Sequence, residues 1–190
     1  MLMRRNKIIY RLALDSMLAA LYFILTYVTI RVGNFHITFA SIMVVIPSIL
    51  FGLPDSIFIA LLGEFLNQIL TYGISITTPL WILPPLFRAL MISCFSTYFI
   101  KKNDRLENHI IIYFIVVLVG GLLTSIANTG ITFLDGYIMG YSVNFVLLTT
   151  IFRFLINIAT SIVVAIVSLP IVKLLRRTTY LESSKRGESW

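Results

Sequence analysis

Long runs of apolar residues alternate along the chain with short stretches that hold most of the lysine and arginine residues. The runs predict six helices, over residues 8–30, 39–53, 56–72, 84–100, 109–133 and 146–175. A helix needs roughly 20 mostly apolar residues to cross the hydrocarbon core of a bilayer, and most of the runs approach that length. The second run is short and contains Pro47, so we expect it to bend or to cross with little tilt. The pattern predicts an all-α fold, a six-transmembrane-helix bundle.

The composition supports a membrane protein. Of the 190 residues, 58% are hydrophobic and 12% are charged, whereas a soluble domain has about 45–50% apolar and about 25% charged residues. We therefore expect residues 1–190 to form a single integral membrane domain, with a polar cytoplasmic tail at residues 176–190. A basic N-terminus before an apolar run is also typical of a signal peptide. This run, however, exceeds the usual apolar region of about 7–15 residues and predicts a retained helix.

Basic residues predict the orientation of the bundle. With an even number of spans both termini lie on one side, and cytoplasmic loops carry an excess of Lys and Arg. Most of the basic residues fall on the side of the termini, so we predict that both termini are cytoplasmic. The clustering also accounts for the net charge of +7, which no nucleic-acid-binding motif accompanies. The residues are Arg4, Arg5, Lys7, Arg11, Lys101, Lys102, Arg105, Lys173, Arg176, Arg177, Lys185 and Arg186.

The stretch over residues 71–88 joins the third and fourth predicted helices. It contains Trp81, a residue type that is most stable at the membrane–water interface, and Pro84, whose ring suits the first turn of a helix. The fourth run carries Arg88 inside its apolar sequence, and the third run carries Glu64. Polar groups at the mouth of two membrane helices require a polar partner, which we take to be a small solute.

The predicted orientation places polar residues of four helices at one depth, in the outer half of the membrane. An ionisable side chain at a helix centre costs about 2.5–3.5 kcal/mol on insertion scales, so such groups usually face a bundle interior or a watery cavity. Arg153 and Asn157 are four residues apart and share a helix face. The candidate substrate-binding residues are Glu64, Asn67, Gln68, Tyr72, Trp81, Arg88, Asn128, Arg153 and Asn157.

Each of these residues also has a purely structural interpretation. Glu64 could form a salt bridge with Arg88 or Arg153, each Asn could hydrogen-bond between helices, and the aromatic residues could belong to an interfacial belt. Two arginines against one glutamate nevertheless leave a positive surplus, and guanidinium groups bind carboxylates well. This charge balance favours an anionic ligand.

The sequence contains no motif for catalysis or for cofactor binding. It lacks a P-loop, the H-E-x-x-H and G-x-S-x-G motifs and a Cys/His cluster for a metal. No pair of acidic residues in the predicted spans suits acid–base chemistry, so we expect no catalytic residue, no cofactor and no metal. A membrane enzyme acting on lipid and a purely structural subunit are the less favoured alternatives. A binding protein without a nucleotide site needs a partner that supplies energy for transport.

Two small residues on the first predicted helix, Ser16 and Ala20, are four positions apart. This spacing puts both on one face and allows another helix to approach closely. From the residues alone, that other helix belongs equally well to the same bundle or to a partner.

Several stretches of the chain resemble the S components of energy-coupling factor (ECF) vitamin transporters. They read I-T-F-A-S-I, F-G-L-P-D, L-N-Q-I-L-T-Y-G and T-P-L-W-I-L-P-P-L-F-R, and the similarity spans about residues 8–175. The resemblance implies a non-catalytic subunit in a bacterial cell membrane, which captures a vitamin from outside for an ATP-driven importer. Its partners would be the membrane coupling subunit EcfT and two ABC-type ATPase subunits. Ser16 and Ala20 would then meet the coupling subunit.

The pattern L-W-I-L-P-P-x-x-R looks most like the pantothenate-type members of this family. Pantothenate is a small monoanion with hydroxyl groups and an amide, in agreement with the charge balance. In this interpretation Arg88 or Arg153 binds its carboxylate, and the Asn and Gln side chains bind the remainder. Folate and, after it, a pyridoxine-like compound are the alternatives.

Overall fold

The computed structural model, which describes residues 2–32, 35–140 and 142–186, contains five long helices and a short one that four of them contact. The long helices are α1 (Leu2–Tyr27), α3 (Leu53–Asn67), α5 (Leu83–Lys101), α6 (Ile110–Met139) and α7 (Val143–Arg186). The short helix, α2 (Ile42–Leu50), contacts α1, α3, α5 and α7. Three further helical segments are short. The π-helix η1 (Gln68–Tyr72) continues α3, and the other two are α4 (Thr78–Trp81) and η2 (Leu106–Asn108).

The lengths of the helices agree with a membrane protein. Within the described residues, five stretches are long and apolar enough to cross a membrane, and the predicted all-α membrane bundle is confirmed. They are Ile9–Tyr27, Leu53–Tyr72, Thr78–Lys101, Ile110–Met139 and Val146–Thr178. Helix α7 continues to Arg186, so most of the predicted polar tail is helical, and residues 187–190 lie outside the described part.

Helix α2 forms the centre of the bundle. Seven of its nine residues are buried, which explains why this run is apolar on all sides. Nine residues rise about 13.5 Å, roughly half the thickness of the hydrocarbon core. Pro47 lies inside the helix, and its carbonyl oxygen accepts from the backbone N–H groups of Phe51 and Gly52 at 2.8 and 3.1 Å. The predicted span over residues 39–53 is therefore a short buried helix with a turn at its end.

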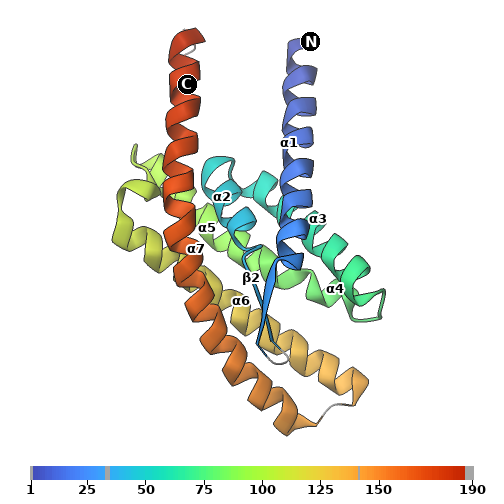
Figure 1. The fold of residues 1–190 in the computed structure, drawn as a ribbon. Helices are drawn as coiled ribbons and strands as arrows, with labels where there is room; N and C mark the ends of the chain where they lie inside the picture. The colour runs from blue at the N-terminus through green and yellow to red at the C-terminus, as the bar shows by residue number, and fades with distance from the viewer. Residues whose placement is uncertain (1, 33–34, 141, 187–190) are drawn as a thin grey trace.

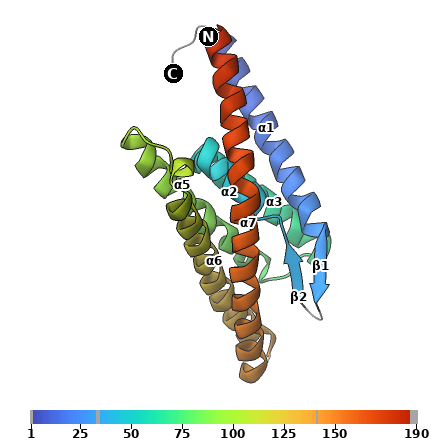
Figure 2. The ribbon, with the colours of Figure 1, turned by 60° about the vertical axis from the view of Figure 1, so that its left-hand side comes forward.

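The two ends of the bundle differ in what they carry. Figures 1 and 2 show the start of α1 and the end of α7 at the same end, which we call the terminal end. The opposite end carries the only strands among the described residues, together with the connection between α6 and α7, and we call it the hairpin end. Around the bundle α1 packs on α3, α3 on α5, α5 on α6, and α6 on α7. The shared end of α1 and α7 agrees with the predicted orientation, and its cytoplasmic location remains a prediction.

A β-hairpin lies between the first two predicted helices, over residues 31–38 and the last two residues of the first predicted helix. Strand β1 (Thr29–Val32) pairs antiparallel with β2 (Phe35–Thr38), in a register that places Thr29 opposite Thr38 and Val32 opposite Phe35. β-branched and aromatic residues favour strands, and the Gly-Asn dipeptide between them is typical of hairpin turns in a sequence. Apolarity alone had extended the first predicted helix to residue 30, although α1 ends at Tyr27.

Candidate functional site

A buried carboxylate lies at the centre of the first polar cluster. The side chain of Glu64 on α3 is almost fully buried, and its Oε1 accepts from Gln68 Nε2 at 2.7 Å and from Asn67 Nδ2 at 3.1 Å. Its Oε2 accepts from the hydroxyl of Tyr22 on α1 at 2.7 Å. Positions three and four residues apart on a helix are neighbours, which brings both amides to the carboxylate. Three neutral donors therefore satisfy a group that would be costly to bury alone.

The local backbone explains how this cluster fits together. Gly63 lies against the ring of Tyr22, since a Cβ at this position would come within 2.5 Å of Tyr22 Cδ1. The π-helix η1 begins at Gln68, directly after Asn67. Such wide turns within helices frequently occur at functional sites. Tyr72, at the end of η1, is exposed.

The second cluster surrounds Arg88 on α5, which is 4% exposed. Its NH2 group donates to Asn157 Oδ1 on α7 at 3.0 Å. Asn157 Nδ2 in turn donates to the carbonyl oxygen of Gly121 on α6 at 2.6 Å and to Ser125 Oγ. Arg88 Nε is buried without a hydrogen-bond partner in the described part of the protein. The cluster joins three helices and leaves one charge-assisted donor unused.

The third cluster surrounds Arg153 on α7. Its NH1 group donates to Thr132 Oγ1 on α6. Its guanidinium carbon lies 5.7 Å from the centre of the Trp81 ring, at the end of α4, which is within range of a cation–π contact. Thr132 also donates to the carbonyl oxygen of Asn128 at 2.7 Å, so Asn128 lies one helical turn from this cluster. All nine predicted residues thus fall in or beside three clusters on α3–η1, α4, α5, α6 and α7.

The charges in these clusters do not pair with one another. Among the residues that the structure describes, no ion pair joins Glu64 to Arg88 or Arg153. The structural interpretation of Glu64 as a salt-bridge partner of either arginine therefore does not hold. The interhelical hydrogen bonds of Asn157, by contrast, are present. The described residues also contain no group of three or more His, Cys, Asp or Glu that could hold a metal ion.

Sequence reasoning missed Tyr22, which contacts Glu64 from another helix. A usable signal was its spacing from Asp15 and Ala19, because positions 15, 19 and 22 form the buried stripe of α1. Ser16 and Ala20 lie on the exposed side of this helix, and Ser16 Oγ donates to the carbonyl oxygen of Leu12 at 2.8 Å.

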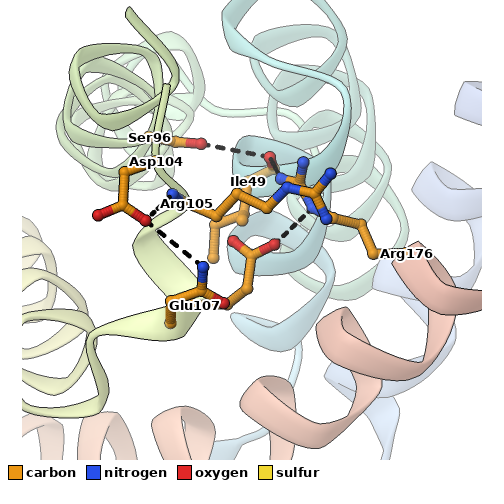
Figure 3. A network of polar contacts seen from close by, with 7 residues as sticks. Ile49, Ser96, Asp104, Arg105, Glu107 and Arg176 are labelled. Carbon is orange, nitrogen blue, oxygen red and sulfur yellow. Dashed lines mark hydrogen bonds and ion pairs between the residues drawn. The ribbon is translucent and has the colours of Figure 1, made fainter. Parts of the chain in front are cut away.

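A separate polar network lies toward the terminal end (Figure 3). Glu107 in η2 is buried, and its Oε1 lies 2.6 Å from Nε of Arg176 on α7. Arg176 NH2 also donates to the carbonyl oxygen of Ile49 at 3.0 Å, and Ser96 Oγ donates to the same carbonyl at 3.2 Å. The network joins η2, α5 and α7 to the last turn of α2. It involves none of the predicted site residues.

A family described as ECF-type riboflavin transporter, S component, matches residues 6–177 of the chain. The chain belongs to this family. The resemblance to ECF S components is therefore confirmed, although its narrower likeness to the pantothenate-type members is not. No curated protein and no solved structure matches the chain. An S component is a transport subunit in the membrane.

Proposed function

We propose that this S component captures riboflavin at the hairpin end of its bundle. The observation that carries the proposal is the presence, in a chain of this family, of polar side chains that are buried on α3 and α5 and half-buried on α7. Arg88 supports it further, because a buried guanidinium with an unused N–H donor favours a polar ligand. The vitamin is taken from the description of the matching family.

The residues of the three clusters suit the chemistry of riboflavin. This vitamin is uncharged at neutral pH and joins a planar three-ring system to a chain of hydroxyl groups. The amides of Asn67 and Gln68 can both donate and accept, as the imide edge and the hydroxyl groups require, and Asn157 Oδ1 can accept. Trp81 and Tyr72 offer aromatic surface for the planar rings. In this proposal Asn128 lies at the same site, and Arg88 and Arg153 donate to carbonyl oxygens of the vitamin.

Pantothenate is the second candidate. It is favoured by the charge balance at the hairpin end, where two guanidinium groups lie without a carboxylate partner among the described residues. An anionic vitamin would neutralise one of them, as guanidinium groups bind carboxylates in two-point contacts. Folate and pyridoxine belong in the same comparison.

Capture is only the first step of transport in this proposal. The subunit works with the membrane coupling subunit EcfT and two ABC-type ATPase subunits, and ATP hydrolysis takes place on those partners. Ser16 and Ala20 on the exposed side of α1 meet EcfT, since small residues allow close helix contact. The terminal end faces the cytoplasm of a bacterial cell, and the vitamin enters from the hairpin end.

Binding to the protein in detergent, without ATP, tests the proposed function. The protein is titrated with riboflavin, pantothenate, folate and pyridoxine, and thermal unfolding is followed for each. A ligand at about 100 times its dissociation constant stabilises the fold by about 2.7 kcal/mol. We expect riboflavin to raise the unfolding temperature and its own fluorescence to be quenched on binding. Stabilisation by pantothenate alone would favour the second candidate, and stabilisation by none of the four would contradict vitamin capture.

A further inference from the structure

We infer that Tyr22 and Glu64 are positioning residues, which hold the amide of Gln68 in the orientation that the substrate site needs. The inference rests on the proposed function, because it assigns Gln68 to that site. It differs from the sequence-based expectation for Glu64, which placed its carboxylate directly against the substrate. It also brings α1, which supplies none of the predicted substrate-binding residues, into the recognition of the vitamin.

The hydrogen bonds of Glu64 indicate this role. Its Oε1 already accepts two amide groups and its Oε2 accepts the Tyr22 hydroxyl, while only 8% of the residue is exposed. A carboxylate in this state has little capacity left for a ligand. It has instead a large effect on its neighbours, because it accepts only and therefore draws the NH2 end of each amide toward itself.

The polarity of the two amides follows from these contacts. With Gln68 Nε2 directed at Glu64, the carbonyl oxygen of Gln68 points away from the carboxylate. The carbonyl oxygen of Asn67 accepts from Thr71 Oγ1 at 3.2 Å. Gln68 therefore presents an acceptor, and the ligand group that it fits is an N–H or O–H donor. Riboflavin carries both kinds.

Tyr22 determines where the carboxylate can lie. Its ring is buried against Gly63, and its hydroxyl is the donor that reaches Glu64 from another helix, at 2.7 Å. The two amide donors come from the same helical segment as Glu64 and would follow any rotation of its side chain. The contact from α1 is the one that fixes Glu64 relative to the rest of the bundle.

The first experiment observes Gln68 without any ligand. Gln68 is the only glutamine in the chain, so protein labelled with ¹⁵N in glutamine side chains gives one pair of NH₂ resonances from one residue. We expect Tyr22→Phe, which keeps the ring, to shift these resonances. Gly63→Ala should shift them too, because the added methyl displaces the ring while the hydroxyl remains.

Tyr113→Phe is the matched control. Tyr113 is also fully buried, and its hydroxyl forms a 2.7 Å hydrogen bond with Ser168 Oγ between α6 and α7. This variant also loses a buried tyrosine hydrogen bond, but to a neutral hydroxyl and away from Glu64. It should lower the unfolding temperature, by less than Tyr22→Phe does, and leave the Gln68 resonances unchanged.

The second experiment measures riboflavin affinity for the same variants. We expect Tyr22→Phe to weaken binding by about three- to tenfold, as the loss of one hydrogen bond would, and Tyr113→Phe to leave it unchanged. In a Gln68→Ala background Tyr22→Phe should have no further effect, since its action passes through Gln68.

The outcomes separate this inference from the proposed function. If the wild-type protein binds no vitamin, the proposed function fails, and the Gln68 resonances alone decide whether Tyr22 and Glu64 hold the amide. Resonances that are the same in Tyr22→Phe as in the wild type, or that Tyr113→Phe shifts equally, would overturn the inference. An undiminished effect of Tyr22→Phe on affinity in the Gln68→Ala background would overturn it as well.

Discussion

The charged side chains at the two ends of the bundle have opposite kinds of partner. Toward the terminal end, each ion pair joins opposite charges within the chain: Arg11 with Asp55, His109 with Asp104, and Arg176 with Glu107. At the hairpin end, Glu64, Arg88 and Arg153 contact neutral groups, namely a phenol, amides, a threonine hydroxyl and an indole ring.

This difference indicates at which end the charged side chains are neutralised within the chain. A buried ion pair returns part of the desolvation cost of its two charges through their mutual attraction. Neutral donors and acceptors can satisfy the geometry of a charged group, but they leave its net charge in place. The terminal end therefore behaves as a structural clamp, whereas the two guanidinium groups at the hairpin end have no ion-pair partner among the described residues. Substitutions that act on stability at one end and on affinity at the other test this contrast.

Removing the buried carboxylate at the terminal end should have the largest effect. Glu107→Gln leaves Arg176 without its ion-pair partner, and breaking a buried pair typically costs 3–5 kcal/mol. Because the Arg176 side chain is 23% exposed, we expect a loss of about 2–4 kcal/mol, which is somewhat less than that range. Thermal unfolding in detergent measures it. Riboflavin affinity of the folded variant should stay at the wild-type value, and a joint loss of stability and affinity would contradict the separation of the two ends.

Removing the buried guanidinium at the hairpin end should mainly affect affinity. Arg88→Met deletes a charged donor, and hydrogen bonds to charged groups are worth about 1.5–3 kcal/mol. We expect riboflavin or pantothenate to bind about 10- to 100-fold more weakly. Arg177→Met, at an exposed position of α7, is the control and should bind normally. Equal affinities for Arg88→Met and the wild type would remove Arg88 from the site.

A smaller effect on affinity is expected at Trp81. Trp81→Leu removes the aromatic face over which Arg153 lies, and a cation–π contact contributes about 0.5–1 kcal/mol when partly exposed. We expect affinity to fall by a factor of about 2–5. The chain has two tryptophans, so in a Trp190→Phe variant the emission of Trp81 alone reports binding. Emission that does not respond to a saturating vitamin would place the ligand away from α4.

The smallest effect is expected at the exposed ion pair. The hydrogen bond from His109, followed by that from the backbone N–H of Arg105, lowers the pKa of Asp104 below its ordinary value. The carboxylate therefore stabilises the fold fully above about pH 4 and loses this contribution as the pH falls through the lowered pKa. Asp104→Asn should be slightly less stable than the wild type at neutral pH, and the difference should shrink in acid and at high salt. A difference that grows in acid would have the wrong sign.

Sequence patterns predicted the helices better than the contacts between them. Runs of membrane length mark the five long helices, because the hydrocarbon thickness sets the number of apolar residues that a span needs. The cost of burying charge singled out Arg88 and Arg153 before any fold was known. The pattern of apolar residues could not distinguish the two strands of the hairpin from a loop, because each strand has only four residues and some of them are polar.

The partners of the charged residues depend on packing between helices that are distant in the sequence. The spacing of Arg153 and Asn157 placed both on one helix face. The contact of Asn157 with Arg88 could not be predicted in this way, because Arg88 lies on another helix, almost 70 residues earlier in the sequence. Glu107 lies in a polar connection that the sequence predicts to be exposed to solvent. It is buried because Arg176 on α7 packs against it. Tyr22 reaches Glu64 across 42 positions. Such contacts require knowledge of which helices are adjacent.

The two-stranded hairpin constrains where the bilayer surface can lie. A ribbon of two strands has two outer edges whose peptide groups lack a third strand, and an unsatisfied peptide group costs several kcal/mol in hydrocarbon. Strand β2 contacts α1 and α7, and every edge group that these helices do not cover needs water. Because the hairpin leads almost directly into α2, the aqueous phase must come close to the start of that short helix. The membrane around this subunit is then effectively thinner on the hairpin side, and a water-soluble molecule has only a short distance to travel from solution to the buried polar groups.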